Sequence, residues 1–380
     1  GPLTGVLTLV DLKGAQVATL GNLANASPDL KDHPVTFTAA TPAVSDGNYK
    51  VHLVLTPADG DPIAKDVDVH VEKGLFKRTL AAEAQANRLF SQLESVHKSE
   101  LADSLQTILY HSELCRLADE QKISPVRVDC DSELKQSEEE LKAVESGTDP
   151  FAGRHGDFRR AYLSKVDKSL QPYRVFVPTS YDGSKPHPLI IALHGMGGDE
   201  NTWFDLYGNG LFKTLAEKHG YIVACPKGRG PASMYQGPAE QDVLDVLAEI
   251  KLNYKIDPDR IYLTGHSMGG FGTWSIAISH PDIFAALAPI SGGGDPKGMK
   301  KIAQIPEIVT HGSNDKTVPV QRSRDMVEAG KKAGAEIKYD EVPGGSHVSV
   351  AVPSFVSIFE FFDSHSKNNE AHAKAAAGQK

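Results

Sequence analysis

The chain is poor in cysteine and long apolar runs, and its charge is not basic; each of these features excludes a class of protein. No stretch of 18 or more consecutive apolar residues occurs in the 380 residues, so the sequence predicts no membrane span. The formal net charge is -9, without the excess of Lys and Arg that marks a nucleic-acid binder. The 15 histidines form neither an HExxH motif nor a short ligand cluster, so we expect no metal and no cofactor.

Cysteine is scarce, and the sequence contains no CxxC motif. Cys115 and Cys130 flank a short helical region, and their spacing leaves a disulfide and two unlinked thiols equally open. No signal peptide is visible either. However, the chain begins Gly1-Pro2, as after a protease cleavage, so the missing leader does not argue for a cytoplasmic location.

Two compositional regions precede the longest part of the chain. In residues 3–73, "YKVHLVL" alternates polar and apolar residues, "PADGDP" is typical of a turn, and "DVDVHVE" places three valines on one face. This predicts a small β-rich domain, a sandwich of immunoglobulin-like type. Residues 74–150 predict a helical connector or hairpin, because apolar residues recur at three- and four-residue spacing: Leu89, Leu93, Val96, Leu101, Leu105 and Ile108.

Residues 151–366 alternate short apolar runs with segments of helix length. The runs are "YRVFVP", "PLIIALHG", "GYIVACP", "DRIYLTG", "ALAPISGG", "PEIVTHG" and "IKYDEVPG". This alternation predicts the α/β class, with a mostly parallel sheet covered by helices on both faces. Entirely apolar runs such as "LIIAL" suit strands that are buried on both sides. Residues 367–380 lack large apolar side chains and predict a disordered tail.

The motif Gly265-His266-Ser267-Met268-Gly269 lies between the apolar run "RIYLT" and a segment with helical periodicity. A serine at such a strand-to-helix turn must occupy a sharp bend that exposes its hydroxyl group. Side chains two positions before and after it would collide across the bend, which accounts for the glycines. The alternative is a glycine-rich turn with a capping serine, but the strand-turn-helix context favours a nucleophile.

A serine nucleophile needs a base and an orienting acid, and the sequence supplies both in the order Ser, Asp, His. Asp315 and His347 each follow an apolar run, so we expect both at the carboxyl edge of the sheet. The alternatives are a turn or capping role for Asp315 and a surface-loop role for His347. Asp340 is the runner-up acid, but it lies within a predicted strand and should point elsewhere, and the neutral Asn314 would orient an imidazolium less well. His365, His311 and His266 are weaker candidates for the base, because their predicted positions direct them elsewhere.

Backbone N–H groups must stabilise the oxyanion that forms during acyl transfer. The residue after the nucleophile, Met268, supplies one of them. The loop His194-Gly195-Met196-Gly197-Gly198 follows an early strand, and its glycines allow the backbone to turn N–H groups inward. Either Gly195 or Met196 is expected to donate, and the sequence leaves the choice open.

Four segments in this order, "LHGMGGDE", "GHSMGG", "HGSNDKTVP" and "GGSH", resemble the α/β-hydrolase superfamily. More narrowly, "DPDRIYLTGHSMGGFGTW" and "FAALAPISGGGDP" are similar to esterases related to polyhydroxybutyrate depolymerases, feruloyl esterases and acetylxylan esterases. The resemblance covers about residues 153–365. It implies that Ser267 is the nucleophile, His347 the general base and acid, and Asp315 the orienting carboxylate. It also implies a secreted or periplasmic location.

The function that we expect is serine ester hydrolysis of aryl or short-chain acyl esters, such as feruloyl or acetyl esters of plant polysaccharide. Trp203, Tyr235 and His194 are candidates for substrate binding, although the two aromatic rings would equally suit packing under loops. A serine peptidase of prolyl-oligopeptidase type and a non-catalytic binding protein on a hydrolase fold are the alternatives. The N-terminal region, residues 1–150, is a candidate lid, docking platform or oligomerisation element.

Overall fold

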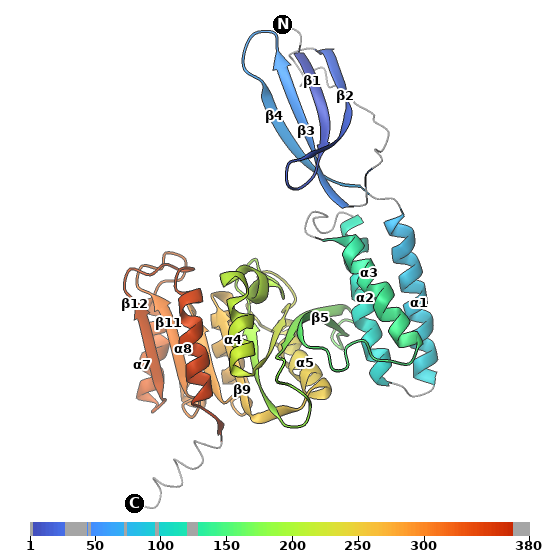
Figure 1. The fold of residues 1–380 in the computed structure, drawn as a ribbon. Coiled ribbons are helices and arrows are strands. Elements are labelled where there is room, and N and C mark those ends of the chain that lie inside the picture. The colour runs from blue at the N-terminus through green and yellow to red at the C-terminus, as the bar shows by residue number, and fades with distance from the viewer. Residues whose placement is uncertain are drawn as a thin grey trace, which may run out of the picture. The chain divides into compact units, whose positions relative to one another are not determined.

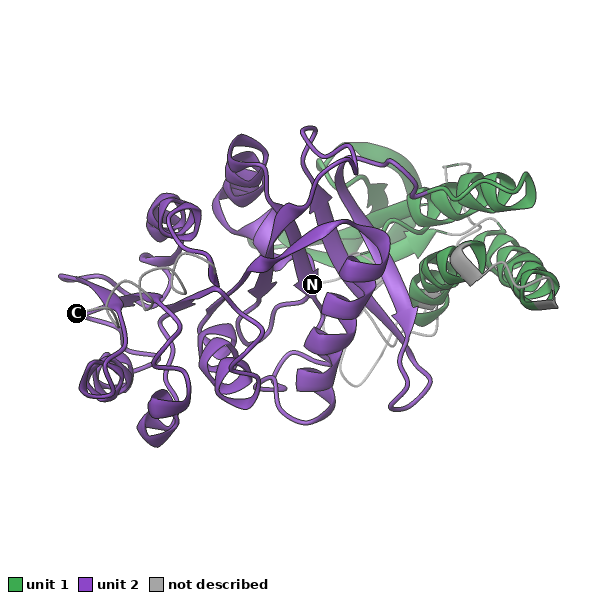
Figure 2. Cartoon of the chain, turned by 90° about the horizontal axis from the view of Figure 1, so that it is seen from below, with its two compact units in different colours: residues 1–150 green, residues 151–380 purple. Residues whose placement is uncertain are grey.

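A computed structural model describes residues 3–26, 44, 47–71, 74–95, 99–119 and 128–367 of the chain. The chain divides into two compact units, residues 1–150 and residues 151–380, which Figure 2 shows in different colours. The predicted disordered tail lies outside the described residues, except for Lys367. The finer division of the first unit at residues 73 and 74 stays a prediction.

The first unit begins with a four-stranded antiparallel sheet in the order β2-β1-β3-β4 (Figure 1). The strands are β1 (Leu3–Val10), β2 (Gln16–Ala26), β3 (Gly47–Pro57) and β4 (Ile63–Val71). Leu9, Tyr49 and Val71 form its small buried cluster. The strands described between residues 3 and 71 form one sheet, whereas an immunoglobulin-like sandwich has two facing sheets. The immunoglobulin-like identity therefore stays a prediction.

Three helices follow in the first unit: α1 (Leu75–Ser95), α2 (Ser99–Asp119) and α3 (Cys130–Glu145). Their facing sides share one apolar cluster, which includes Leu89 of α1, Leu105 of α2 and Leu141 of α3. Cys115 and Cys130, whose pairing the sequence left open, are free thiols in this structure. The Cys115 thiol lies 3.6 Å from the main-chain oxygen of Cys130.

The second unit is built on an eight-stranded sheet in the order β12-β11-β10-β9-β7-β8-β6-β5. Strand β6 runs antiparallel to both of its neighbours, β5 and β8. The other six strands, β12, β11, β10, β9, β7 and β8, are parallel to one another. The strands are β5 (Gly156–Leu163), β6 (Leu170–Val177), β7 (His187–Leu193), β8 (Ile222–Pro226), β9 (Ile256–His266), β10 (Ala286–Ile290), β11 (Glu307–Gly312) and β12 (Ile337–Val342).

Helices cover both faces of this sheet because its central strands are apolar on both sides (Figure 1). Along β7, Leu189, Ile191 and Leu193 join one core, and Ile190 and Ala192 join the other. The first core includes residues of α5 (Pro238–Asn253), α6 (Met268–Ser279) and α7 (Gln321–Lys332), and the second includes residues of α4 (Leu211–His219) and α8 (Ala351–Asp363). Shorter helical turns are η2 (Thr202–Leu206), η3 (Gly208–Gly210) and η4 (Pro296–Lys301).

The predicted α/β class, with a mostly parallel sheet and helices on both faces, is confirmed. Each of the seven apolar runs coincides with a strand, β6 to β12. Strand β5 had no such signal, because "GDFRRAYL" carries charges and lies at the edge of the sheet. In the part of the chain that the structure describes, no helix is both long enough and apolar enough for a bilayer crossing.

Candidate active site

Ser267 occupies the bend between β9 and α6, with φ 59° and ψ -118°. Positive φ is uncommon for a residue with a side chain, and such strain persists only where the surroundings hold it. Here the Ser267 amide donates a hydrogen bond to the main-chain oxygen of Ile290, at 2.9 Å. Parallel pairing of β9 with β10 brings Ile290 beside His266 and so places this acceptor.

The two glycines of the motif lie where no side chain fits. A Cβ atom added at Gly265 would lie 2.2 Å from the main-chain oxygen of Gly269. A Cβ atom added at Gly269 would lie 2.1 Å from the main-chain oxygen of Leu193, at the end of β7. Both obstacles are backbone atoms, which cannot swing aside as a flexible side chain can. The structure thus gives the GxSxG pattern a steric cause.

Ser267, His347 and Asp315 form a continuous hydrogen-bonded chain. The Ser267 hydroxyl lies 2.8 Å from Nε2 of His347, and Nδ1 of His347 lies 2.6 Å from Oδ2 of Asp315. Each residue lies just beyond the carboxyl end of a parallel strand, β9, β12 and β11 respectively. Parallel strands end at the same edge of a sheet, which is why residues far apart in sequence meet there.

The loops that carry Asp315 and His347 are joined by their own backbones. The Asn314 amide donates to the main-chain oxygen of Gly345 at 3.0 Å, and the Ser313 amide donates to that of Val342 at 3.0 Å. A Cβ atom added at Gly312 would lie 2.3 Å from the oxygen of Gly345, so the two loops are in close contact. This contact sets the acid and the base at a defined separation.

Asp315 is almost completely surrounded by donors. Its Oδ1 accepts the amides of Thr317 and Val318 at 2.8 and 2.9 Å, and its Oδ2 accepts His347 and faces Nε2 of His311 at 3.2 Å. Burial alone would raise the pKa of Asp315, but the hydrogen bonds from His347, Val318 and Thr317 outweigh it, and the pKa is lowered. Asp315 is therefore a carboxylate at neutral pH.

His311 is a poor candidate for the base on sequence grounds, and in the structure it lies next to Asp315 instead. Its ring is buried, with Nδ1 2.6 Å from the Ser323 hydroxyl and Nε2 3.0 Å from the main-chain oxygen of Val318. Because Nε2 faces only acceptors, it must carry the proton and donate. Burial lowers the pKa of His311, so the ring is neutral. His311 thus faces the same carboxylate oxygen as His347 and helps to hold the acid in place.

The predicted oxyanion loop lies directly beside the nucleophile. Parallel pairing sets Leu193 opposite Gly265, and a Cβ atom added at Gly195 would lie 3.4 Å from Cβ of Ser267. Within this loop the amides of Gly197 and Gly198 donate to other carbonyl groups, those of Pro231 and Gly195. That leaves Gly195 and Met196 as candidates for the second donor. Met268 begins α6, and the first amides of a helix have no intrahelical acceptor.

The three predicted substrate-binding side chains are all fully buried. The Trp203 ring packs in the core against Phe212 and Phe355, at centroid distances of 4.8 and 5.3 Å. The Tyr235 hydroxyl donates to the main-chain oxygen of His194 at 3.3 Å. The ring nitrogens of His194 lie 2.8 Å from the main-chain oxygens of Gly195 and Lys227. The structure does not bring these side chains to the surface of the site. The Tyr235 hydroxyl and the His194 ring instead make hydrogen bonds to the backbone of the oxyanion loop.

Large apolar side chains in the segments around the site residues are exposed instead. Met196 is 64% exposed and lies in the oxyanion loop, and Val348 is 61% exposed and follows His347. Leu206, at the end of η2, is 71% exposed. We call these three residues the apolar rim. Exposed apolar side chains of this kind offer contact area to an apolar part of a ligand.

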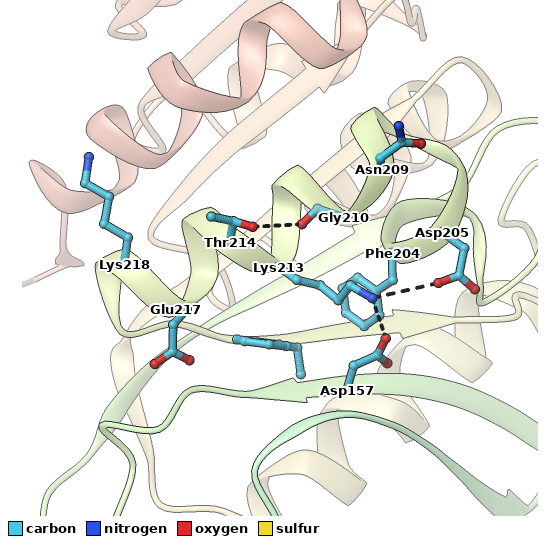
Figure 3. Close-up of a pocket in the computed structure, with 10 residues that line it drawn as sticks. Asp157, Phe204, Asp205, Asn209, Gly210, Lys213, Thr214, Glu217 and Lys218 are labelled. Carbon is cyan, nitrogen blue, oxygen red and sulfur yellow. Dashed lines mark hydrogen bonds and ion pairs between the residues drawn. The ribbon is translucent and has the colours of Figure 1, made fainter.

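A separate groove of about 940 Å³ contains no residue of the Ser-His-Asp chain. It runs along α4, and Phe176 and Phe204 contribute to its lining (Figure 3). The Lys213 ammonium group lies 2.7 Å from Asp157 and 3.8 Å from Asp205. Arg174 pairs with both carboxylates as well, so two positive charges balance two negative ones. Since no nucleophile–base pair lines it, this groove is not the site of acyl chemistry. Among the described residues there is also no group of three or more His, Cys, Asp or Glu side chains arranged to hold a metal ion.

Comparison with known proteins gives this geometry a context. Residues 212–307 match the model of the prolyl oligopeptidase family. A bifunctional acetylxylan esterase/xylanase of Neocallimastix patriciarum is 33% identical over 138 residues, 36% of this chain and 20% of that protein. A poly(3-hydroxyalkanoate) depolymerase C of Paucimonas lemoignei is 31% identical over 28% of each chain. Feruloyl esterase B of Talaromyces stipitatus is 30% identical over 33% of this chain and 36% of that protein.

Among solved structures, the crystal structure of a thermostable esterase superposes with a TM-score of 0.50 and 28% identity. The match covers 56% of this chain and 63% of that one. The chain spans only about a fifth to a third of the length of the three curated relatives named above. The resemblance seen in the sequence is nevertheless confirmed: the chain contains an α/β-hydrolase domain related to feruloyl esterases, acetylxylan esterases and polyhydroxyalkanoate depolymerases.

Proposed function

We propose that this α/β-hydrolase domain is a serine carboxylic ester hydrolase in which Ser267 is the nucleophile, His347 the general base and acid, and Asp315 the orienting carboxylate. The observation that carries the proposal is the unbroken chain of hydrogen bonds, 2.8 Å from Ser267 to His347 and 2.6 Å from His347 to Asp315. In addition, Ser267 has a positive φ and lies at the N-terminus of α6, where backbone amides favour developing negative charge.

The reaction begins when His347 takes the hydroxyl proton of Ser267 while Oγ attacks the ester carbonyl carbon. The carbonyl oxygen becomes an oxyanion, which the amides of Met268 and of Gly195 or Met196 stabilise. His347 then gives its proton to the leaving alkoxide as the C–O bond breaks, which leaves an acyl group on Ser267. In the second half, His347 takes a proton from water, hydroxide attacks the acyl carbon, and the proton returns to Ser267 as the acid leaves.

Asp315 does not accept a proton in this scheme. Four donors surround its carboxylate, and its lowered pKa keeps it ionised while His347 becomes an imidazolium. Its negative charge 2.6 Å from Nδ1 stabilises that cation and keeps Nε2 directed at the serine. Each oxyanion donor contributes about 3 kcal/mol of transition-state stabilisation in hydrolases of this kind.

The proposed substrates are aryl or short-chain acyl esters, including hydroxycinnamoyl and acetyl esters of plant polysaccharide. Two observations support this class: the relatives' names include feruloyl and acetylxylan esterases, and the exposed apolar rim suits an apolar acyl group. Secretion or a periplasmic location, in keeping with a polysaccharide-linked substrate, is part of the same proposal. So is self-association through residues 1–150, which the molar mass of the full chain in solution would reveal.

The match to the prolyl oligopeptidase model favours peptide hydrolysis as the second candidate. Both reactions use the same triad and differ in the leaving group, an alcohol or an amine. Turnover of p-nitrophenyl acetate by the wild type and its loss in Ser267→Ala would support the serine hydrolase mechanism. No turnover, or turnover unaffected by that substitution, would leave a binding protein as the better description. Methyl ferulate, acetylated xylan and aminoacyl amides, assayed side by side, then separate ester from peptide hydrolysis.

A further inference from the structure

His266, the residue before the nucleophile, is buried but makes two hydrogen bonds that reach across the site. Its Nε2 lies 2.8 Å from the main-chain oxygen of His347, and its Nδ1 lies 2.8 Å from the hydroxyl group of Tyr207. The ring is only 3% exposed. The bend directs this side chain away from the serine hydroxyl, toward the backbone of His347 and the Tyr207 hydroxyl.

The partners of His266 define its tautomer. The carbonyl oxygen of His347 can only accept, so Nε2 carries the proton and donates to it. In a neutral ring Nδ1 then holds a lone pair, and the Tyr207 hydroxyl is the group that donates to it. Burial lowers the pKa of His266 to about 4, although the bond to the His347 carbonyl opposes the shift. Around neutral pH the ring is therefore uncharged, with each nitrogen in the role that its partner requires.

The oxygen that accepts the His266 Nε2 proton belongs to His347, the base, whose position must be accurate for catalysis. His347 lies in the loop between β12 and α8, and no ladder or helix hydrogen bonds fix its carbonyl group. Besides His266, the buried Ser291 hydroxyl donates to the same oxygen, at 3.3 Å. Tyr207 comes from the segment between the oxyanion loop and α4. The segment that follows the oxyanion loop, the nucleophile turn and the loop of the base thus meet through one imidazole ring.

A neutral His266 also suits the chemistry of its neighbour. The rings of His266 and His347 have centroids 4.9 Å apart. During acyl transfer His347 becomes positively charged, and a second positive charge at that distance would oppose the change. The Tyr207 hydroxyl occupies Nδ1 as a donor and so favours the uncharged ring.

We propose that Tyr207 and His266 form a positioning relay, which holds the main chain of His347 so that its Nε2 meets the Ser267 hydroxyl. The inference rests on the proposed function, in which His347 is the base. Neither relay residue touches the reacting atoms; both act through His347. Loss of the relay lowers the rate of the chemical step and leaves substrate binding nearly unchanged.

Three substitutions test the relay on the full chain with p-nitrophenyl acetate. His266→Phe keeps an aromatic ring but removes both nitrogens, and we expect kcat to fall by roughly 100-fold, because displacements of about 1 Å have effects of that size. KM should change less than about 3-fold. His266→Gln restores an amide donor toward the His347 carbonyl and should recover most of the loss. Tyr207→Phe removes only the hydroxyl and should lower kcat by roughly 10-fold.

The chain offers a matched control at the amino-terminal ends of the parallel strands, away from the carboxyl ends that carry the site. His187, at the start of β7, is 6% exposed and packs edge-on against Tyr181, with ring centroids 5.1 Å apart. The His266 and Tyr207 rings meet edge-on in the same way, at 5.5 Å. His187→Phe and Tyr181→Phe should therefore disturb packing to a similar extent but leave kcat within about 3-fold of wild type. Equal losses in both pairs would overturn the relay.

A second measurement does not depend on turnover. The proton between His347 Nδ1 and Asp315 should give a far-downfield proton NMR signal, because that bond is 2.6 Å long. We expect His266→Phe to broaden or abolish the signal and His187→Phe to retain it. If the signal persists in His266→Phe, the relay is refuted whether or not the protein hydrolyses esters. If His266→Phe loses the signal and His187→Phe retains it, but the wild type hydrolyses no substrate, the proposed function fails while the relay stands.

Discussion

Glu307 is a buried carboxyl group that should make the second unit less stable as the pH rises. It begins β11, its side chain is fully buried, and Trp274 Nε1 donates to its Oε2 at 2.8 Å. Its other oxygen has no hydrogen-bond partner in the described structure. Burial raises the pKa of Glu307 to about 8, and the Trp274 hydrogen bond only partly offsets this.

The direction of the pH effect depends on whether the folded or the unfolded chain holds the Glu307 proton more tightly. Below pH 4.5, the ordinary pKa, the carboxyl group is protonated in both the folded and the unfolded state and has no effect on their balance. Between pH 4.5 and about 8 the unfolded chain ionises and the folded one does not, so the free energy of unfolding falls as the pH rises. The full difference, at about 1.4 kcal/mol per pH unit, is on the order of 5 kcal/mol.

Glu307→Gln removes this titration while it keeps an oxygen for Trp274. The amide N–H groups gain no partner, so we expect the variant to be about 1–3 kcal/mol less stable than wild type at pH 5. It should equal or exceed wild type by pH 8, where the wild type carries the cost of ionisation. Both tryptophans, Trp203 and Trp274, lie in the second unit and are buried, so fluorescence during urea unfolding reports on this unit alone.

The control for this experiment is Glu328→Gln, an exposed residue that pairs with Lys332 on α7. Its free energy of unfolding should follow the wild-type curve at every pH. Parallel curves for wild type and Glu307→Gln between pH 5 and 8 would refute the reasoning. They would mean that Glu307 finds water or a cation in the folded protein and ionises there without difficulty.

Three further predictions concern the site. Asp315→Asn should lower kcat by roughly 1,000-fold or more with little change in KM, because the imidazolium loses its counter-charge and its orientation; steady-state kinetics check this. Gly269→Ala should cost about 2–4 kcal/mol of unfolding free energy, since its Cβ would lie 2.1 Å from a backbone oxygen, whereas Gly230→Ala, with open space, should change little in urea titrations. Met196→Ala should lower kcat/KM for methyl ferulate by roughly 10-fold and for a short acetyl ester by less than about 3-fold.

The grouping of Ser267, Asp315 and His347 could be predicted from the sequence because it depends on local patterns. Each of the three follows an apolar run, and parallel strands all end at one edge of the sheet. Order along the chain and strand ends were therefore sufficient to bring the three side chains together. The substrate could not be predicted in this way, since acyl specificity depends on loop side chains that follow no repeating pattern.

The aromatic residues show the limit of such reasoning. Trp203 follows the oxyanion loop in sequence, which is equally compatible with a pocket wall and with a core position. What decides between them is Phe355 of α8, 152 residues later, whose ring lies 5.3 Å from that of Trp203. Met196 and Val348 were the reverse case: apolar residues that the three-dimensional structure leaves exposed beside the nucleophile. Burial is a property of the assembled layers, and local sequence carries little of it.

Two histidines next to the base and its acid are a further case in which the sequence does not reveal a role. His266 and His311 look like poor candidates in the sequence, because neither directs a nitrogen at the serine hydroxyl. The two hydrogen-bond partners of His266 lie 59 and 81 residues away in the sequence, so no local pattern indicates its role. In each ring, Nε2 faces an acceptor and Nδ1 faces a hydroxyl group. Burial lowers the pKa of both rings, so each is uncharged at neutral pH and its Nε2 proton points toward His347 or Asp315. Two side chains that cannot act as the base can therefore still determine where the base and its acid lie.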